Sequence, residues 1–279
     1  MTEHNSSADN YLLGHTPFAI QRLLRLGQIY HPFTRSMLIE AGLTTGMRVL
    51  DIGCGPGDVS LIAAELVGET GRVLGVDASS DMLGVAQSRM QAAGLTHVSF
   101  LAADLRTLTL GQSFDALIGR FILMHLPEPA EVLRHLLSSV DPGGLVAFQE
   151  YELSSHHDAF YPPSSLWEQT YRLTTLPFER AGGNLHAGMQ LPAMFAAAGL
   201  PAPRMRYEAS IGADRDWPGF DMRADDVRTF LPLILQLGLA AEEEVDIDTL
   251  AERLREETVG HSGAARLPVL VSAWTRTAS

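Results

Sequence analysis

Three glycines fall within five positions of the sequence, directly after an apolar run that contains an aspartate. The segment VLDIGCGPGD covers residues 49–58. Glycine lets the main chain bend sharply and lie against a ligand, because no side chain stands between them. The spacing G-x-G-x-G differs from the G-x-G-x-x-G that places a pyrophosphate at a helix N-terminus. It suits a ligand with an amino-acid group and a nucleoside, and the candidate contacts are Asp51, Gly53, Cys54, Gly55 and Gly57.

Two further acidic residues end neighbouring apolar segments. Asp77 ends RVLGVD, twenty residues after Gly57, where a carboxylate can accept hydrogen bonds from both hydroxyls of a ribose. Asp104 ends HVSFLAAD and can accept a hydrogen bond from the exocyclic amine of adenine. Met82 belongs to the first turn of the helix after Asp77, and its polarizable side chain can lie against the base. The sequence therefore predicts a nucleoside site across three strand ends.

Strands alternate with helices through the region that carries these residues. The predicted strands are 47–53, 72–77, 97–104, 114–121 and 145–152, and the predicted helices are 58–67, 79–94 and 127–140. This order is typical of parallel strands in a doubly wound sheet, and uniformly apolar strands fit a sheet that is covered on both faces. Further strands at 204–212 and 267–277 complete the prediction of a Rossmann-like α/β fold with a seven-stranded, mostly parallel sheet.

Helical segments surround the predicted sheet. Apolar positions in residues 17–42 predict two helices that are broken near His31-Pro32. Additional helices are expected at 189–200, 223–240 and 246–258, and the last two form an insertion between the final strands. The predicted domains are an N-terminal helical cap (1–44), a core that binds the ligand (45–152), a lid (153–200) and a C-terminal part of the sheet with its helical insertion (201–279).

Composition excludes several classes of function. The formal net charge is −13 and no basic stripe offsets it, so attraction to nucleic acid or to an anionic membrane is not expected. The chain contains no lysine, which excludes Schiff-base catalysis and the lysine of a P-loop. One cysteine in 279 residues and a polar N-terminus fit a cytoplasmic protein. A homodimer is compatible with these observations.

Five segments resemble, in order and spacing, the successive motifs of class I S-adenosylmethionine-dependent methyltransferases. They are VLDIGCGPGDVS, VLGVDASSDML, FLAADLRTL, FDALIGRFILMHLPEP and LLSSVDPGGLVAFQEYE, within residues 45–152. The core is similar to the ubiquinone and menaquinone C-methyltransferases. The resemblance implies S-adenosyl-L-methionine as cofactor, with its methionine part on the glycine loop. It implies ribose at Asp77 and Ala78, adenine beside Ala103, Asp104 and Leu105, and the cofactor's amino group at the backbone of Arg120 and Phe121.

The segments YLLGH and QRLLRLGQIYHPFTRSML resemble the N-terminal helices of small-molecule methyltransferases from bacteria. Such helices cover the cofactor, so Tyr11, His15 and Gln28 are expected to line the closed site.

Four residues are candidates for catalysis. His125 follows the fourth strand, where the acceptor pocket of such folds begins, and can act as a general base or as a pocket wall. His15 is a candidate because the cap faces the cofactor. Glu150 and Tyr151 end the fifth strand, and either can orient an acceptor hydroxyl. We expect Cys54 to be a packing residue, and no metal is expected, since the adjacent His156 and His157 lack ligand spacing.

These observations favour methyl transfer to a small apolar or aromatic acceptor, with O-methylation ahead of C-methylation and N-methylation behind. Positioning of the acceptor behind the S–CH₃ bond would supply much of the catalysis. Phe160, Trp167 and Phe178, among other aromatics, can clamp a flat acceptor or form the core of the lid. Two alternatives remain open: a protein that binds the cofactor without transferring methyl, and a nicotinamide-dependent oxidoreductase.

Overall fold

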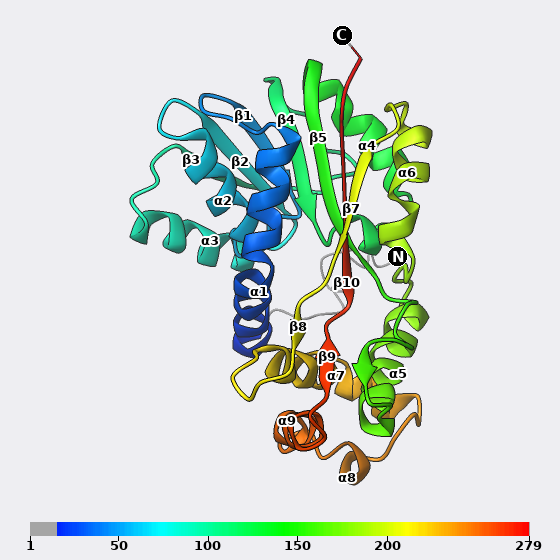
Figure 1. The fold of residues 1–279 in the computed structure, drawn as a ribbon. Helices are drawn as coiled ribbons and strands as arrows, with labels where there is room; N and C mark the ends of the chain where they lie inside the picture. The colour runs from blue at the N-terminus through cyan, green and yellow to red at the C-terminus, as the bar shows by residue number, and fades with distance from the viewer. Residues whose placement is uncertain (1–15, 279) are drawn as a thin grey trace, which may run out of the picture.

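The computed structural model describes residues 16–278 of the chain, and these form two sheets with helices around them (Figure 1). The larger sheet has seven strands in the order β3-β2-β1-β4-β5-β10-β7. Its strands are β1 (Arg48–Ile52), β2 (Arg72–Asp77), β3 (Val98–Ala102), β4 (Phe114–Arg120), β5 (Val140–Glu152), β7 (Arg204–Glu208) and β10 (Val269–Arg276). The strands from β3 to β5 are parallel, and β10 is antiparallel to both of its neighbours. The predicted doubly wound, mostly parallel sheet of seven strands is confirmed.

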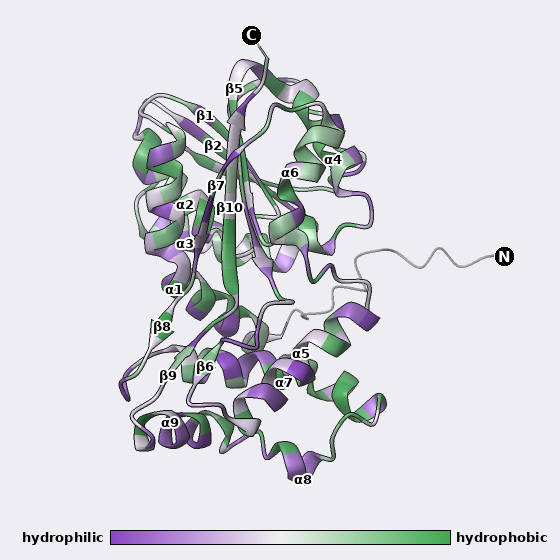
Figure 2. Ribbon diagram, turned by 45° about the vertical axis from the view of Figure 1, so that its right-hand side comes forward, coloured by the Kyte–Doolittle hydropathy of each residue, from purple (hydrophilic) through white to green (hydrophobic). Residues whose placement is uncertain are grey.

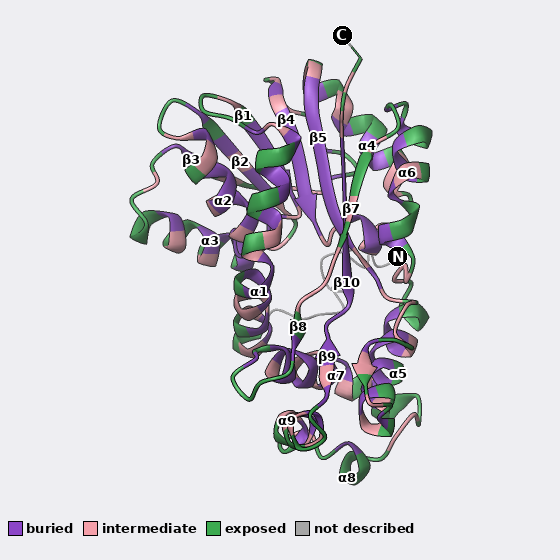
Figure 3. Cartoon of the chain, in the orientation of Figure 1, coloured by how far each residue is buried: buried purple, intermediate pink, exposed green. Residues whose placement is uncertain are grey.

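Helices cover both faces of this sheet. They are α1 (Pro17–Ala41), α2 (Asp58–Val67) and α3 (Ser80–Ala92) around one face, and α4 (Pro129–Leu136) and α6 (Ala187–Ala198) on the other. Each face of the sheet has its own cluster of buried apolar residues. Val49 of β1 belongs to the cluster that includes α2, whereas its neighbour Leu50 belongs to the cluster that includes α4 and α6. Successive side chains of a strand point to opposite faces, so a strand covered on both sides is apolar throughout. Figure 3 shows β1, β4 and β5 buried along most of their length.

The remaining elements gather beyond one end of the large sheet (Figure 1). The helices are α5 (Ser165–Arg180), α7 (Gly219–Gln236), α8 (Glu242–Val245) and α9 (Leu250–Gly260), and the strands β6 (Phe160–Tyr161), β8 (Ile211–Gly212) and β9 (Ala264–Arg266) form a small antiparallel sheet. Short 3-10 turns lie at Leu123–His125 and Leu137–Ser139. From here on, the name cap refers to α5, α7, α8 and α9 with the small sheet, and no longer to the predicted N-terminal helical cap. Figure 2 shows polar residues on the outer turns of α9, and hydrophobic residues along β10, which enters the large sheet.

The predicted break near His31-Pro32 is wrong, because α1 is one helix of 25 residues that contains Pro32. Proline cannot donate a hydrogen bond to the carbonyl of Gln28. Both residues are exposed, so water can take the place of that bond. The apolar face continues on both sides of the proline, with Tyr30 before it and Met37 after it fully packed in the core. Tertiary packing therefore overrides the local signal.

The chain from 201 onward also differs from its prediction. The expected strand 204–212 is divided between β7, in the large sheet, and β8, in the small one. The expected strand pair β7 and β10 is present, and α7, α8 and α9 form the insertion between them. None of the helices within residues 16–278 is long and apolar enough to cross a membrane.

Candidate active site

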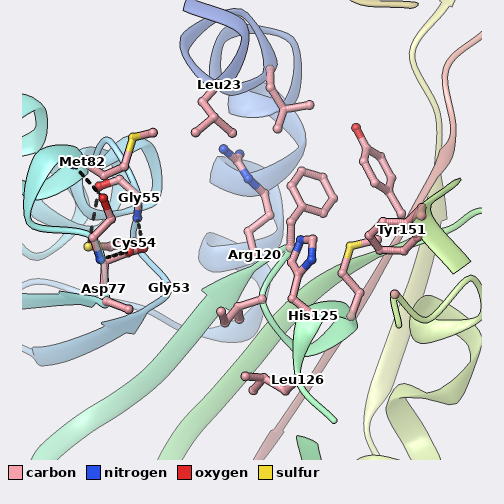
Figure 4. A pocket seen from close by; sticks show the side chains of 18 of the residues that line it. Leu23, Gly53, Cys54, Gly55, Asp77, Met82, Arg120, His125, Leu126 and Tyr151 are labelled. Carbon is pink, nitrogen blue, oxygen red and sulfur yellow. Dashed lines mark hydrogen bonds between the residues drawn. The ribbon is translucent and has the colours of Figure 1, made fainter. Parts of the chain in front are cut away.

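A cavity of about 660 Å³ opens where the carboxyl ends of the parallel strands meet α1 and the cap. Its two ends differ in origin. The loop side is formed after β1, β2 and β3 by Gly53, Cys54, Gly55, Asp77, Met82 and Asp104. The cap side is formed by α1, the turn after β4, α5 and α7, with Arg22, Leu26, His125, Phe178, Arg223 and Phe230. Figure 4 shows Arg120 between Gly55 and Asp77 on one side and His125 and Tyr151 on the other.

The glycine loop leaves a hollow at its middle residue. Gly55 has a φ of +51°, and a Cβ built on it would meet nothing within 4 Å. By contrast, a Cβ on Gly53 would lie 2.6 Å from Ile122, and one on Gly57 would lie 3.0 Å from Ala86. Gly53 and Gly57 therefore allow the loop to pack against its neighbours. Gly55 leaves bare backbone facing the cavity, which fits a ligand that lies against the main chain.

Asp77 is held rigidly beside that backbone. Its Oδ2 accepts a hydrogen bond from the Gly55 N–H at 2.9 Å, and its Oδ1 accepts one from the Ser79 N–H at 2.9 Å. An ionised carboxylate has about four lone-pair sites, so each oxygen retains capacity for a further donor. Asp77 lines the cavity and can therefore accept two vicinal hydroxyls while keeping its backbone partners.

Asp51 lies beneath the loop and is 1% exposed. The Ser60 hydroxyl donates to its Oδ2 at 2.6 Å, whereas its Oδ1 is buried and has no hydrogen-bond partner within residues 16–278. Burial raises the pKa of Asp51 to about 7, and the Ser60 hydrogen bond opposes this rise. An unsatisfied carboxylate of this kind is costly, and a cation near the loop would stabilise its charged form. This fits a ligand that carries an ammonium group.

Cys54 is 6% exposed, and burial raises the pKa of its thiol well above the ordinary value. The neutral thiol is a poor nucleophile, which agrees with a packing role. Ala78, Met82, Ala103 and Leu105 also line the loop side. Asp104 stands at its rim, where Arg106 lies 2.5 Å away and holds the pKa of that carboxyl below its usual range. Contact of Asp104 with an adenine amine stays a prediction.

Arg120 projects from the end of β4 into the cavity and is 9% exposed. Its Nη1 donates to the Thr34 hydroxyl at 2.8 Å, which donates to Gln149 at 2.7 Å. Burial lowers the pKa of Arg120, and the charges of Asp58 and Asp51 act in the opposite direction. A guanidinium stays charged in proteins, so Arg120 presents a fixed cation near the glycine loop. A carboxylate of a bound ligand is its natural counter-ion.

Phe121 has a φ of +57°, which is unfavourable for a residue with a side chain. Its N–H donates to the Gln149 carbonyl at 2.9 Å, and its ring stacks on Tyr151 with centroids 4.1 Å apart. The strained turn brings the Phe121 ring to the cavity wall and places the next residues under the cap.

The catalytic candidates from the sequence have different positions. His125 lines the cavity, its ring contacts Phe178 edge-on, and burial lowers its pKa to about 4. Its imidazole is therefore neutral near pH 7 and weakly basic. Tyr151 also lines the cavity, and burial raises its pKa well above 10, which keeps its hydroxyl protonated. His125 can accept a proton or a hydrogen bond, whereas the Tyr151 hydroxyl already shares a hydrogen bond with Tyr30.

Glu150 is fully buried behind the turn after β4 and does not line the cavity. Its carboxylate accepts the N–H groups of Ile122, Leu123 and Met124 at 3.0, 2.8 and 3.3 Å. Burial raises its pKa to about 8, against these hydrogen bonds. The placement contradicts the expectation that Glu150 orients an acceptor, since its oxygens already fix the turn that carries His125.

Gln28 does not line the site either. It is exposed on the outer face of α1, while Arg22, Leu23 and Leu26 face the cavity. The helical period explains the correction, because positions 22, 26, 29 and 30 share the buried face and position 28 lies opposite. Tyr11 and His15 lie outside the described residues.

Sequence reasoning missed three charged residues of the cap side: Arg22, Arg223 and Asp226. A signal was available for the arginines. Arg22 follows Ala19 and precedes Leu26 at spacings of three and four, and Arg223 precedes Val227 by four. A charged residue within an apolar helical stripe points to a buried role. Of the aromatic residues named from the sequence, Phe178 reaches the cavity, whereas Trp167 packs inside the cap at 1% exposure.

Comparison with known proteins agrees with this arrangement. Residues 43–189 match the family model described as a methyltransferase domain. The chain is 33% identical over 141 residues to aklanonic acid methyltransferase DauC from Streptomyces sp. (strain C5), covering 50% of this chain and 64% of the relative. It is 31% identical over 157 residues to the ubiquinone/menaquinone C-methyltransferase UbiE from Cellvibrio japonicus, covering 56% and 61%. The chain thus spans less than two thirds of these relatives.

A solved structure extends the likeness in fold over the whole chain. Phosphoethanolamine N-methyltransferase 2 from Haemonchus contortus, in complex with S-adenosylhomocysteine, aligns with 100% of this chain and 62% of its own, at a TM-score of 0.59 and 18% identity. The matched family model, together with the sheet order and the glycine loop, shows that the chain belongs to the class I S-adenosylmethionine-dependent methyltransferases.

Proposed function

We propose that the chain transfers a methyl group from S-adenosylmethionine to an oxygen atom of a small, apolar or aromatic acceptor. The observation that carries this proposal is a cavity that joins the bare backbone of Gly55 and the acceptors of Asp77 to a second compartment under the cap, whose walls are both apolar and charged. A cofactor and an acceptor can therefore share one space.

On the loop side, we assign the cofactor to specific groups. Gly55 offers backbone to its methionine part, and Asp77 offers two oxygens to its ribose. Met82, Ala103 and Leu105 offer apolar contact to its base. Arg120 suits the cofactor's carboxylate, because it carries a fixed charge near the loop. Asp51, from below, stabilises its ammonium group.

When bound, S-adenosylmethionine supplies a methyl group on a positively charged sulfur, which is a strong electrophile. The residues of the chain must hold an acceptor atom in line with that bond and keep water away. Leu23 and Leu26 of α1 and Phe178 and Phe230 of the cap supply an apolar wall for this purpose. Alignment and exclusion of water are then the main sources of rate.

A proton must leave an acceptor hydroxyl when its oxygen is methylated. His125 is placed to receive it, but a pKa of about 4 makes it a weak base in the free protein. An acceptor that arrives already ionised avoids this step. The Tyr151 ring lines the cavity and is held by stacking on Phe121, so it can position the acceptor by contact. We therefore propose positioning by Tyr151 and an auxiliary role for His125.

The printed names of the relatives give a range of acceptors. One acts on aklanonic acid and another, from Azoarcus sp. (strain BH72), on trans-aconitate. The C-methyltransferases act in quinone biosynthesis. We favour oxygen over carbon because His125 lines the cavity and can accept a hydrogen bond from an acceptor hydroxyl. That the protein works in the cytoplasm and forms a homodimer stays a prediction.

The test uses purified protein with methyl-labelled S-adenosylmethionine and a small-molecule extract. Mass spectrometry should reveal a labelled product that exceeds its precursor by one CH₂ group, together with S-adenosylhomocysteine. A Gly55→Val variant should give neither. Tight cofactor binding without any labelled product would favour a protein that uses the cofactor without transferring methyl, and binding of NADH instead would favour an oxidoreductase.

A further inference from the structure

The cap side of the cavity carries an excess of buried positive charge. Arg22 of α1 and Arg223 of α7 line it and are only 6% and 2% exposed. One carboxylate, Asp226, stands between them. Its Oδ1 lies 3.0 Å from Nη1 of Arg22, and its Oδ2 lies 3.7 Å from Nη2 of Arg223. Two guanidinium groups thus share one carboxylate, which leaves one positive charge uncompensated.

Neighbouring groups do not remove this excess. His125 is neutral near pH 7 because burial lowers its pKa, and the charge of Arg22 contributes to that shift. Tyr151 stays protonated. The adjacent carboxylate Asp225 pairs with Arg25 at 2.8 Å and does not line the cavity. The charge of Arg22 also acts on Asp225. Counted together, three arginines (Arg22, Arg25 and Arg223) face two carboxylates (Asp225 and Asp226), so one positive charge remains in excess.

Both guanidinium groups also have unused donors. The Nε atoms of Arg22 and Arg223 are buried and have no hydrogen-bond partner within residues 16–278. Arg223 is otherwise well held: its Nη2 donates to the Thr174 hydroxyl at 2.6 Å, and its guanidinium lies 4.8 Å from the centre of the Tyr171 ring. Buried donors and charges are costly unless a partner satisfies them. The Nε atoms are enclosed, but both guanidinium groups line the cavity, and a rigid cationic site of this kind is suited to an anion.

We infer that the acceptor is an apolar or aromatic carboxylic acid whose carboxylate is held between Arg22 and Arg223. This inference rests on the proposed function and names its substrate class. The guanidinium fork matches the two oxygens of a carboxylate. One excess positive charge balances a monoanion, whereas a phosphate dianion would exceed it. Leu26, Phe178 and Phe230 line the same cavity and suit the hydrocarbon part of the acid.

The charge inside the cavity differs in sign from the net charge of the whole chain. A formal charge of −13 suggests a preference for cations. Charge on the outer surface is screened within about 10 Å at ordinary ionic strength, while the buried arginines act directly on the ligand. The interior of the cavity, and not the net charge, selects the acceptor.

The experiment compares two probes that have similar shape and differ in charge. Phenylacetate and phenylacetamide are titrated by ligand-detected NMR into protein saturated with S-adenosylhomocysteine. We expect the acid to bind about tenfold more tightly than the amide, as charge-assisted hydrogen bonds are the stronger ones. Arg22→Gln should abolish this preference, and so should Arg223→Gln. Arg25→Gln is the matched control on the outer side and should retain it.

Arg223 also packs in the cap, so Arg223→Gln could lose the preference simply by misfolding. A second variant, for which the preference should increase, separates these two explanations. Asp226→Asn keeps the shape of the side chain and raises the excess charge, so the preference for the acid should increase by several-fold. Equal binding of acid and amide by the wild type, or a smaller preference in Asp226→Asn, would overturn the inference. If S-adenosylhomocysteine itself does not bind, the proposed function falls, and the acid–amide comparison on the free protein still decides the inference.

Discussion

The loop side of the cavity comes from one stretch of chain, residues 53–106, whereas the cap side joins residues as distant as Arg22, Phe178 and Phe230. The two sides also differ in charge. The loop side holds the carboxylates of Asp77 and Asp104 together with the guanidinium groups of Arg106 and Arg120. On the cap side, Arg22 and Arg223 share the single carboxylate of Asp226. A zwitterionic amino-acid group suits the first arrangement, and an anionic acceptor suits the second.

This difference separates binding of a common cofactor from selection of a particular acceptor. The turns after parallel strands meet at one sheet edge because of topology alone. The cap side depends on how α7 packs on α1 and α5, which sequence changes in the cap can alter without disturbing the loop. Variants can therefore damage one side and spare the other.

The largest effect is expected from filling the hollow at Gly55. Gly55→Val places a branched side chain where the ligand would lie, at a φ that such residues resist. Binding of S-adenosylhomocysteine, measured by calorimetry, should weaken by at least about a hundredfold. Gly94→Val is the matched control, since Gly94 has a φ of +69° and equally open surroundings on a remote turn. Equal loss of binding in both variants would contradict a special role of Gly55.

Removal of the Asp77 carboxylate should have the next largest effect. Asp77→Ala deletes acceptors for the Gly55 and Ser79 N–H groups and for the ligand. We expect affinity for S-adenosylhomocysteine to fall by about 1–3 kcal/mol. Asp81→Ala, on an exposed position of α3, should leave affinity unchanged. Unchanged affinity in Asp77→Ala would remove the ribose assignment, and the acid–amide preference of the cap side should persist in this variant.

The raised pKa of Asp51 should make cofactor affinity depend on pH, without affecting ligand binding on the cap side. Its pKa of about 7 in the free protein leaves it partly protonated near neutrality. A ligand ammonium favours the ionised form, so binding should release a proton. Affinity should then rise with pH up to about 7 and level off above it, with a change of up to about tenfold per pH unit below that value. Calorimetry in buffers of different ionisation enthalpy measures the release, and Asp51→Asn should abolish it.

His125 predicts a smaller effect, on stability. Its pKa falls from 6.5 to about 4 on folding, so the unfolded chain binds a proton that the folded protein does not. The contribution of neutral His125 to the free energy of unfolding is therefore complete above about pH 6.5 and is lost as the pH falls toward 4. His125 lines the cavity and is only half-buried, so this contribution is smaller than full burial of the ring would give. Urea unfolding of His125→Gln should show a shallower acid decline than wild type, and the exposed His261→Gln should show none of this change.

The accuracy of sequence-based prediction follows the same division. The glycine loop, the position of Asp77 at a strand end and the alternation of strands with helices were predictable, because each rests on a local pattern of residues. The prediction that Gln28 lines the site was wrong, because the helical period places Gln28 opposite the buried face that carries Leu26 and Tyr30. The prediction for Glu150 was wrong because no local sequence pattern shows that its carboxylate accepts three backbone N–H groups from the turn after β4. The pairing of Arg22 with Asp226 depends on tertiary packing across 204 residues, which no spacing rule provides.

The central claim is that the bare backbone at Gly55 and the carboxylate of Asp77 hold S-adenosylmethionine in the cavity. A crystal structure of the protein with S-adenosylhomocysteine tests it most directly. The account predicts the ribose on Asp77, the amino-acid part against Gly55 and Arg120, and the sulfur facing the compartment lined by His125 and Tyr151. A nucleoside bound elsewhere, or no binding at saturating concentration, would contradict it.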